Sequence, residues 1–307
     1  MKKKTELEAA GKKIPVSNLD KILYPETGFT KGDLIHYYIN VSVTLLPHLK
    51  GRPITLKRYP DGVEGGFFYE RHCPAHKPAW LKTARVERHS AGETIDYCVL
   101  DDLPSLVWAA NLANIELHPF LHKGRTSDRP DSVAFDLDPG APAEVLDCAR
   151  VALWMKEIFE ALELQSFVKT SGSKGLQVFI PLNSAVTYDK TKTFSRTVAE
   201  YLERRHPDTV VSKMQKVLRK GKVLIDWSQN DDHKTTVSVY SLRAKARPTV
   251  STPLQWSEVQ TAVKKADAKR LVFESGDVLK RIKKQGDLFA PVLTLKQKLP
   301  TPAKLHF

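Results

Sequence analysis

The chain has 307 residues, of which 41% are hydrophobic and 27% charged, so it can form a hydrophobic core and is not disordered. Lysine and arginine number 48 against 35 acidic residues, and the net charge of +13 favours a polyanionic partner, nucleic acid or an anionic membrane surface. The sequence contains no run of about 18 apolar residues that would predict a membrane span, and no apolar run near the N-terminus that would predict a signal peptide. The cysteines at positions 73, 98 and 148 are scattered and odd in number, which argues against a secreted disulfide framework and favours a reducing cytoplasm.

The first half of the chain alternates short strands with helices. Residues 1–13 carry five lysines, which predicts a flexible basic tail, and the hydrophobic pattern begins at Ile14. Thr30 followed by Asp33 predicts the start of a helix. The further elements predicted here are strands at 53–58 and 94–99, a helix with an aspartate N-cap at 103–112, and strands at 115–121 and 132–137.

The second half has clearer periodicity. Apolar residues recur at spacings of three and four from Val145 to Leu162, which predicts a helix with one buried face. The alternation of elements favours an α+β or mixed α/β fold, with one domain over residues 14–295 and a C-terminal tail at 296–307. The other elements predicted here are strands at 166–169, 176–180 and 222–225, a helix at 190–205, and basic helices beyond residue 252.

Several chemistries are excluded by their missing signatures. The sequence has no G-x-x-x-x-G-K-[ST] phosphate loop, no H-E-x-x-H, no C-x-x-C pair and no K-x-D-G string of a covalent nucleotidyl-lysine enzyme. His72, Cys73 and His76 combine metal-binding residue types, but such close spacing rarely encloses one ion and no fourth ligand is suggested nearby. We therefore do not expect a zinc site there.

Paired acids mark the end of the strand predicted at 132–137. Asp136 and Asp138 lie on one face of an extended chain, and Pro139-Gly140 ends the strand beside them. Adjacent carboxylates repel each other, and a divalent cation relieves the repulsion; otherwise the pair is a solvated strand end. Asp226 ends another apolar strand, and if the two strands are neighbours the three acids form a ligand set for two Mg²⁺ or Mn²⁺ ions. The spacing leaves that adjacency open.

A Gly/Ser-rich turn separates the strands predicted at 166–169 and 176–180. Thr170-Ser171-Gly172-Ser173-Lys174-Gly175 can direct backbone N–H groups inward as an anion nest, to which Lys174 adds a charge. By itself such a segment is better explained as a hairpin turn. Beside a carboxylate cluster it becomes a candidate triphosphate cradle.

Several motifs in this order resemble one family. They are Ser17-Asn18-Leu-Asp-Lys21, Thr30-Lys31-Gly-Asp, Arg58-Tyr-Pro-Asp-Gly, Gly66-Phe67-Phe68-Tyr-Glu, Phe-Asp136-Leu-Asp138-Pro-Gly, Thr170-Ser-Gly-Ser-Lys-Gly-Leu, Asp226-Trp-Ser-Gln229-Asn and Tyr240-Ser-Leu-Arg243. From about residue 14 to residue 253 or beyond, the chain is similar to the polymerase domain of bacterial DNA ligase D, the archaeo-eukaryotic primase-type polymerase of non-homologous end joining. The resemblance implies an α+β primase-polymerase-like fold with a central, mostly antiparallel sheet flanked by helices.

The resemblance also implies roles for individual residues. Asp136, Asp138 and Asp226 match the catalytic, metal-binding acids for two Mn²⁺ or Mg²⁺ ions. Without the family, Phe67 and Phe68 would be read as core residues. Further matches are Ser171, Lys174, Arg219, Gln229 and Arg243 for the nucleotide, His118 for its sugar, Asn18, Lys21 and Lys31 with nearby Arg58 for a DNA 5′-phosphate, and Phe67 and Phe68 for stacking on the template.

One position departs from the family pattern. After the Ser-Gly-x-x-Gly-x turn the family has a histidine that contacts the nucleotide phosphates, whereas this chain has Gln177. Glutamine donates a neutral hydrogen bond but carries no charge. The substitution predicts a slow but live polymerase, in which Lys174 and Arg219 partly compensate, unless Gln177 faces away from the nucleotide.

The function implied by the resemblance is template-directed, metal-dependent addition of nucleotides at DNA ends and gaps. The expected substrates are nucleoside triphosphates, NTP over dNTP, and the expected partners are DNA with a 5′-phosphate at a gap or break, a DNA ligase and Ku, with no membrane, in the cytoplasm at the nucleoid. The alternative is a catalytically weak or inactive module that binds or aligns DNA ends. Priming from scratch is left open. Ligase and phosphoesterase motifs are missing, so we expect a stand-alone polymerase or an excised domain.

Overall fold

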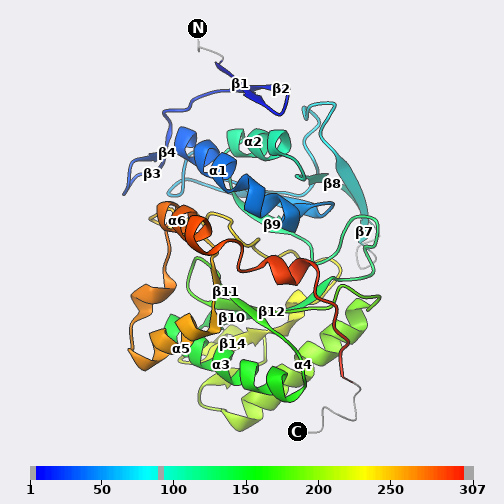
Figure 1. The fold of residues 1–307 in the computed structure, drawn as a ribbon, viewed down its shortest axis with the longest axis vertical. Coiled ribbons are helices and arrows are strands. Elements are labelled where there is room, and N and C mark those ends of the chain that lie inside the picture. The colour runs from blue at the N-terminus through cyan, green and yellow to red at the C-terminus, as the bar shows by residue number, and fades with distance from the viewer. Residues whose placement is uncertain (1–4, 89–92, 301–307) are drawn as a thin grey trace. The chain divides into compact units, whose positions relative to one another are not determined.

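The computed structural model describes residues 5–88 and 93–300, and its fold is drawn in Figure 1. The chain forms two compact units, each assembled from three separate segments. The single domain expected over residues 14–295 therefore contains two units whose segments alternate along the chain. Unit 1 comprises residues 1–127, 235–250 and 274–286, and unit 2 comprises residues 128–234, 251–273 and 287–307.

Unit 2 is built on a six-stranded sheet with the order β13-β14-β10-β12-β11-β15. Its neighbouring strands are antiparallel except β13 and β14, as expected for a mostly antiparallel α+β fold. The strands are β10 (Ser132–Pro139), β11 (Phe167–Thr170), β12 (Leu176–Pro181), β13 (Val210–Val211), β14 (Val223–Asp226) and β15 (Pro253–Leu254).

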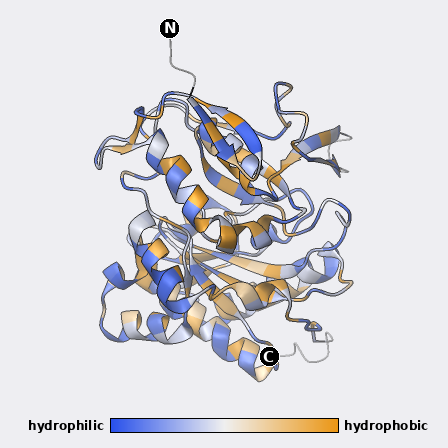
Figure 2. Ribbon diagram, turned by 45° about the horizontal axis from the view of Figure 1, so that its top comes forward, coloured by the Kyte–Doolittle hydropathy of each residue, from blue (hydrophilic) through white to orange (hydrophobic). Residues whose placement is uncertain are grey.

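One face of this sheet forms the hydrophobic core of unit 2. Val133, Phe135 and Leu137 alternate along β10 and are fully buried against helices, of which α3 contributes Met155 and Phe159. The apolar strands of this sheet and the apolar sides of its helices are visible in Figure 2. The helices are α3 (Val145–Ala161), α4 (Tyr188–Arg205) and α5 (Trp256–Lys264), with short 3-10 helices η1 (Lys216–Arg219), η2 (Trp227–Gln229), η3 (Ala268–Leu271) and η4 (Ala290–Leu293).

Unit 1 contains a second, five-stranded sheet, in which β6, β5, β8 and β7 follow one another and β9 pairs with β5. The predicted helix start is confirmed, because Thr30 caps α1 through an Asp33 N–H to Thr30 Oγ1 bond of 3.1 Å. The elements are β3 (Ile22–Tyr24), β4 (Phe29–Thr30), α1 (Lys31–Leu49), β5 (Pro53–Arg58), β6 (Phe68–Glu70), β7 (Thr83–Arg88), β8 (Glu93–Val99), α2 (Leu103–Asn111), β9 (Asn114–Pro119) and α6 (Ser275–Gln285).

The two terminal segments differ from the expected tails. Strands β1 (Thr5–Ala9) and β2 (Lys12–Val16) form a hairpin. The prediction of a flexible tail over residues 1–13 was therefore wrong for the part that the structure describes. Ala10 and Gly11 both have positive φ, as in a type I′ turn, and the lysine-rich composition concealed the alternation that buries Ile14 and Val16. Gln297 holds the start of the C-terminal segment through a 2.9 Å bond to the Pro181 carbonyl. Residues 1–4 and 301–307 of the expected tails lie outside the described residues.

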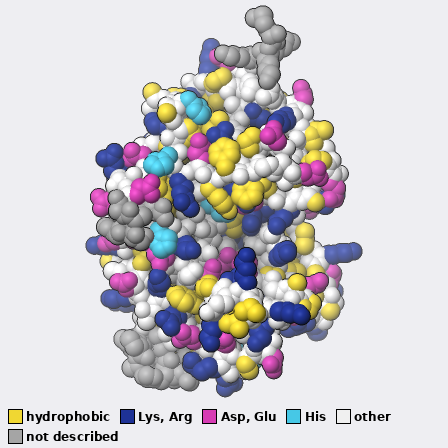
Figure 3. All heavy atoms as spheres, turned by 180° about the vertical axis from the view of Figure 1, so that it is seen from behind, with side chains coloured by type: hydrophobic (Ala, Val, Ile, Leu, Met, Phe, Trp, Pro, Cys, Tyr) yellow, Lys and Arg dark blue, Asp and Glu magenta, His cyan; other side chains and the backbone are white. Residues whose placement is uncertain are grey.

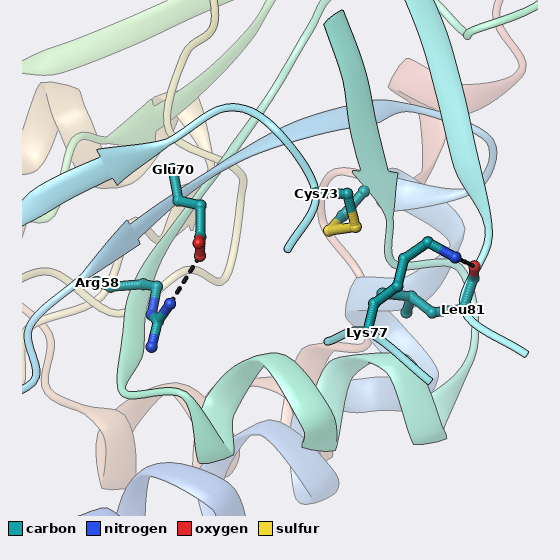
Figure 4. Close-up of a disulfide and its surroundings, with 6 residues drawn as sticks. Arg58, Glu70, Cys73, Lys77 and Leu81 are labelled. Carbon is teal, nitrogen blue, oxygen red and sulfur yellow. Dashed lines mark hydrogen bonds and ion pairs between the residues drawn. A yellow bond between two sulfur atoms is a disulfide. The ribbon is translucent and has the colours of Figure 1, made fainter. Parts of the chain in front are cut away.

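The cysteines also depart from expectation. Cys73 and Cys98 form a disulfide, shown in Figure 4, while Cys148 is a buried thiol in the core of unit 2. The two partners are 25 residues apart, and strand β8 brings them together because the Cys73 N–H donates to the Asp96 carbonyl. This pairing removes the argument from cysteine usage for a reducing compartment. Within the described residues, no helix is long and apolar enough to cross a membrane.

Candidate active site

Three predicted acids share one face of the unit 2 sheet. Asp136 on β10 lies directly opposite Asp226 on β14, and Asp138 follows two residues along the same strand. Their neighbours Phe135, Leu137 and Ile225 belong to the hydrophobic core, so the acids point to the opposite face. The strand adjacency that the sequence left open is therefore present in the structure.

The electrostatics of this face suit a cation. Burial and the neighbouring charges of Asp138 and Asp226 together raise the pKa of Asp136 to about 7, against a hydrogen bond from Gln177 that lowers it. A divalent ion bound to these oxygens would offset both the burial and the repulsion. The three carboxylates thus fit a hard cation by donor type and by charge.

Asp226 is held by the turn that follows it. Ser228 donates to Asp226 Oδ1 from its backbone N–H at 2.9 Å and from its hydroxyl at 2.6 Å. Gln229 Nε2 donates to Asp226 Oδ2 at 3.1 Å, while Gln229 Oε1 is buried and has no hydrogen-bond partner among the described residues. Gln229, expected at the nucleotide, therefore contacts the acid and leaves an acceptor available.

Gln177 faces the acids and does not point away from them. Its Nε2 donates to Asp136 Oδ1 at 3.0 Å, and its Oε1 accepts from Lys169 Nζ at 2.5 Å. Lys169 is only 1% exposed and also donates to Ser251 Oγ at 2.7 Å. Lys169 was not among the predicted site residues, and its single signal in the sequence was a lysine that follows the apolar residues Phe167 and Val168.

The Ser/Gly turn is closed by its own serine. Ser171 Oγ accepts from the N–H groups of Ser173 and Gly175, each at 3.2 Å, so these two donors are used inside the turn. Gly175 is required for packing, since a Cβ there would lie 1.9 Å from the Leu137 carbonyl oxygen. Lys174 is exposed at the tip. The anion nest expected from the sequence is thus only partly available in this conformation.

Arg219 lies at the end of η1 beside the same strands. Its Nη2 donates to the Met214 carbonyl, and its Nε is buried with no partner within residues 5–88 and 93–300. Gly140 allows the backbone of Arg219 to approach closely, because a Cβ at position 140 would lie 1.9 Å from the Arg219 carbonyl oxygen. A buried guanidinium donor without a partner fits an anionic ligand.

The remaining predicted nucleotide residues lie in unit 1 around Glu116. The Glu116 carboxylate is 2.8 Å from His118 Nε2, 3.2 Å from Arg243 Nε and 3.4 Å from Lys57 Nζ. Burial alone would raise the pKa of Glu116, but the His118 hydrogen bond and the nearby cationic side chains outweigh it and hold the pKa below its usual value. Burial lowers the pKa of His118. Glu116 was not predicted from the sequence, although its carboxylate contacts the predicted residues His118 and Arg243.

The predicted 5′-phosphate residues gather around the start of α1. Burial and the charges of Lys21 and Arg58 together lower the pKa of Lys31 to about 8, so these three cations lie close together. Lys21 pairs with Asp61 at 2.8 Å, and Arg58 pairs with Glu70 at 2.8 Å (Figure 4). Asn18 is exposed with a positive φ of 54° just before this cluster.

The two predicted stacking residues are exposed. Phe67 and Phe68 are 52% and 44% exposed, and Tyr69 beside them is 53% exposed, so reading the phenylalanines as core would have been wrong. Lys57 Nζ lies 4.5 Å from the centre of the Phe67 ring. Exposed aromatic rings next to cations are typical of surfaces that bind single-stranded nucleic acid. Lysine and arginine side chains are numerous on the molecular face shown in Figure 3.

Two other groups contain metal-binding residue types. Cys73 is in the disulfide, which leaves no thiolate for a zinc site with His72 and His76. In the described part of the chain, ligand atoms of Asp231, Asp232 and His233 lie within 4.8 Å of one another. Asp231 already pairs with Lys192 and contacts His233 Nδ1 at 2.7 Å, so these contacts account for the cluster without an ion.

The α+β fold, the opposed acids and the adjacent Ser/Gly turn together define a domain of the primase-polymerase type. The family model described as "LigD, primase-polymerase domain" matches residues 30–289. The chain therefore belongs to the LigD primase-polymerase domain family.

Individual relatives agree with this assignment. The chain is 35% identical to the multifunctional non-homologous end joining protein LigD of Mycolicibacterium smegmatis, over 91% of this chain and 36% of that protein. It is 33% identical to the bifunctional LigD of Bacillus subtilis, over 96% of this chain and 46% of that protein. The polymerase domain of Mycobacterium tuberculosis ligase D, solved in complex with DNA, is similar with a TM-score of 0.84 and 35% identity, covering 92% of this chain and 99% of that chain. The chain thus spans less than half of these two curated relatives.

Proposed function

We propose that this chain is a template-directed, divalent-metal-dependent nucleotidyltransferase that acts at DNA ends and gaps in non-homologous end joining. Ribonucleoside triphosphates are its preferred substrates. The observation that carries the proposal is the direct opposition of Asp136 and Asp226 on neighbouring strands, with Asp138 on the same face. The relatives' names and the DNA-bound structural neighbour support a DNA-repair setting.

The acids would hold two Mg²⁺ or Mn²⁺ ions, which when bound lower the pKa of an attacking hydroxyl and neutralise a leaving pyrophosphate. The buried Arg219 Nε and Gln229 Oε1 would bind the nucleotide together with Ser171 and Lys174. In unit 1, Glu116 orients His118 and Arg243, which match nucleotide-binding positions of the family.

A second group of residues would contact the DNA. Lys21, Lys31 and Arg58 would bind a 5′-phosphate at a gap or break, with Asn18 beside them, and Phe67 and Phe68 would stack on the template strand. A DNA ligase and Ku are the proposed partners, in the cytoplasm at the nucleoid.

The test is primer extension on a gapped duplex with a downstream 5′-phosphate, with Mn²⁺ and with ATP or dATP in parallel. Loss of one acid should raise the activation barrier for nucleotidyl transfer by several kcal/mol. The Asp136→Asn variant should therefore extend the primer at least about a hundredfold more slowly. Its gel-shift affinity for the gapped DNA should change less than about twofold, because phosphate contacts dominate binding. Asp208→Asn, an exposed acid in the same unit, is the matched control and should extend like wild type.

A wild-type rate in Asp136→Asn would refute the catalytic centre. The replacement of the family histidine by Gln177 favours a second candidate, a weak or inactive module that binds or aligns DNA ends. Tight binding of the gapped DNA with no extension by the wild type in either metal would support that candidate.

A further inference from the structure

Four polar residues form a continuous row across the unit 2 sheet. Lys169 on β11 lies directly opposite Gln177 on β12, Gln177 opposite Asp136 on β10, and Asp136 opposite Asp226 on β14. These four strands are neighbours in the sheet. All four side chains point to the face opposite the hydrophobic core, since Val168, Val178, Phe135 and Ile225 belong to that core. The row runs from a cationic residue through a neutral one to two acids.

Lys169 is a buried cation that is held in place by hydrogen bonds. Its side chain is 1% exposed, and burying an ammonium group is unfavourable unless hydrogen bonds compensate. Nζ donates to Gln177 Oε1 at 2.5 Å and to Ser251 Oγ at 2.7 Å, and lies 5.6 Å from the centre of the Phe179 ring. Ser251 in turn donates to the Thr170 carbonyl at 2.9 Å. The backbone of two adjacent segments therefore fixes the position of Nζ.

The chemistry of lysine decides how the Gln177 amide is turned. A lysine Nζ has only donors, so the amide group facing it must be the carbonyl oxygen. The amide NH₂ then faces Asp136 and donates to its Oδ1 at 3.0 Å. With the amide reversed, the Gln177 oxygen would face the Asp136 carboxylate, and two acceptors would oppose each other. Gln177 is 3% exposed, so water cannot readily replace either contact.

We propose that Lys169 is a positioning residue of the metal centre, which acts through Gln177 to hold the Asp136 carboxylate in its metal-binding orientation. This rests on the proposed function, since it assumes that Asp136 binds a divalent ion. Removing the partner that orients a ligand typically weakens metal affinity about 10- to 100-fold. Lys169 does not touch nucleotide or metal in this role.

The test measures binding of Mn²⁺ alone to the full chain by electron paramagnetic resonance, without nucleotide or DNA. Lys169→Met, which keeps the length of the side chain and removes its donors, should raise the Mn²⁺ dissociation constant at least about tenfold. The matched control is Lys156→Met, a lysine of α3 that pairs with Glu160 on the helix surface, and it should bind Mn²⁺ like wild type. Unfolding curves establish that each variant is folded.

A second variant separates positioning from general structural damage. Gln177→Met removes the same link from the other side and should also weaken Mn²⁺ binding. If Lys169 acts through Gln177, the double variant should bind Mn²⁺ no more weakly than Gln177→Met alone, whereas independent structural effects would add. Gln177→Met also tests the link should Lys169→Met fail to fold.

The outcomes distinguish failure of the positioning role from failure of the metal centre. Wild-type Mn²⁺ affinity in Lys169→Met, or additive losses in the double variant, would overturn the positioning role. If Asp136→Asn loses Mn²⁺ binding while Lys169→Met keeps it, the metal centre stands and only the role of Lys169 is refuted. If Asp136→Asn itself binds Mn²⁺ like wild type, the assignment of the metal centre in the proposed function fails and the role of Lys169 falls with it.

Discussion

Asp136 in unit 2 and Glu116 in unit 1 are carboxylates on β-strands, and burial works against the charge of each. Asp136 has two further acids beside it, and its pKa is raised to about 7. Glu116 faces His118, Arg243 and Lys57, and its pKa is held below its usual value. The difference shows that neighbouring charge, and not burial alone, decides which carboxylate is stable as an anion.

The two groups therefore affect stability over different pH ranges. For Asp136 the folded pKa is raised, so without metal its contribution to stability is present at low pH and is lost as pH rises from about 4 through 7. For Glu116 the folded pKa is depressed, so its contribution is present above about pH 4.3 and is lost as pH falls. Asp136 depends on a bound cation to stabilise its charge, whereas Glu116 is already paired with cationic side chains of the protein.

The largest effect is expected where the paired carboxylate is removed. Glu116→Gln leaves Arg243 and Lys57 without their buried counter-charge, which should lower the free energy of unfolding by about 3–5 kcal/mol. Urea unfolding at pH 7 measures it. The control is Glu160→Gln, which breaks a surface pair with Lys156 and should lower stability by less than about 0.5 kcal/mol. A similar small loss in both variants would remove the contrast between the two carboxylates.

The opposite sign is expected at Asp136. Asp136→Asn removes a charge that its neighbours disfavour, so in EDTA at pH 8 it should raise the free energy of unfolding by about 1–3 kcal/mol. The gain should shrink toward pH 5, where the wild-type Asp136 is largely protonated. Urea unfolding at the two pH values decides this, and an equal gain at both would show that the charge of Asp136 is not responsible.

The third prediction concerns Lys31, a cation whose pKa is also shifted by burial and by neighbouring charges. Lys31 is buried near Lys21 and Arg58, its pKa is lowered to about 8, and a bound phosphate must restore its proton above that pH. The preference for 5′-phosphorylated over unphosphorylated gaps should fall from pH 7 to pH 9 in the wild type. Lys21→Ala with Lys31→Ala should lose roughly tenfold of that preference at pH 7, because charge-assisted bonds are strong.

Gel-shift affinities for the two gapped substrates, at fixed salt, measure this preference, since salt alone changes the affinity strongly. Lys283→Ala on α6, an exposed lysine of unit 1, is the control and should keep the preference. A double variant that still prefers the phosphorylated gap as the wild type does would refute the pocket.

The smallest effect is expected at Gln177. A protonated histidine there would strengthen contact with a triphosphate, but Lys169 Nζ beside it disfavours a second positive charge. Gln177→His should therefore raise kcat/KM for the nucleotide by only about fivefold, the lower end of what a charged donor supplies. Steady-state extension across pH measures it, and a gain far above this would show that Lys169 does not oppose the charge.

Local patterns in the sequence were enough to predict much of the fold. The Thr30 cap, the α3 periodicity and the placement of Asp136 and Asp138 on one face all depend on residues a few positions apart, and the structure confirms them. The N-terminal hairpin was missed because the five lysines of residues 1–13 dominated the composition of that segment.

Long-range strand pairing explains what the sequence could not provide. The position of Asp226 opposite Asp136 depends on a pairing between strands about ninety residues apart, and the contact of Lys169 with Ser251 spans a similar distance. Glu116 shows the same limit, since its partner Arg243 comes from a distant segment. The individual residues were visible in the sequence, but the charges that surround each of them were not.

The alternation of the two units along the chain has a consequence for synthesis on the ribosome. Unit 1 lacks its third segment, with α6, until residue 286 has been made, and the third segment of unit 2 begins only at residue 287. The growing chain therefore cannot complete one unit and then begin the other. Both must wait for their third segments to leave the exit tunnel, so residues 5–127 are synthesised well before the last segment of unit 1, residues 274–286, can pack with them.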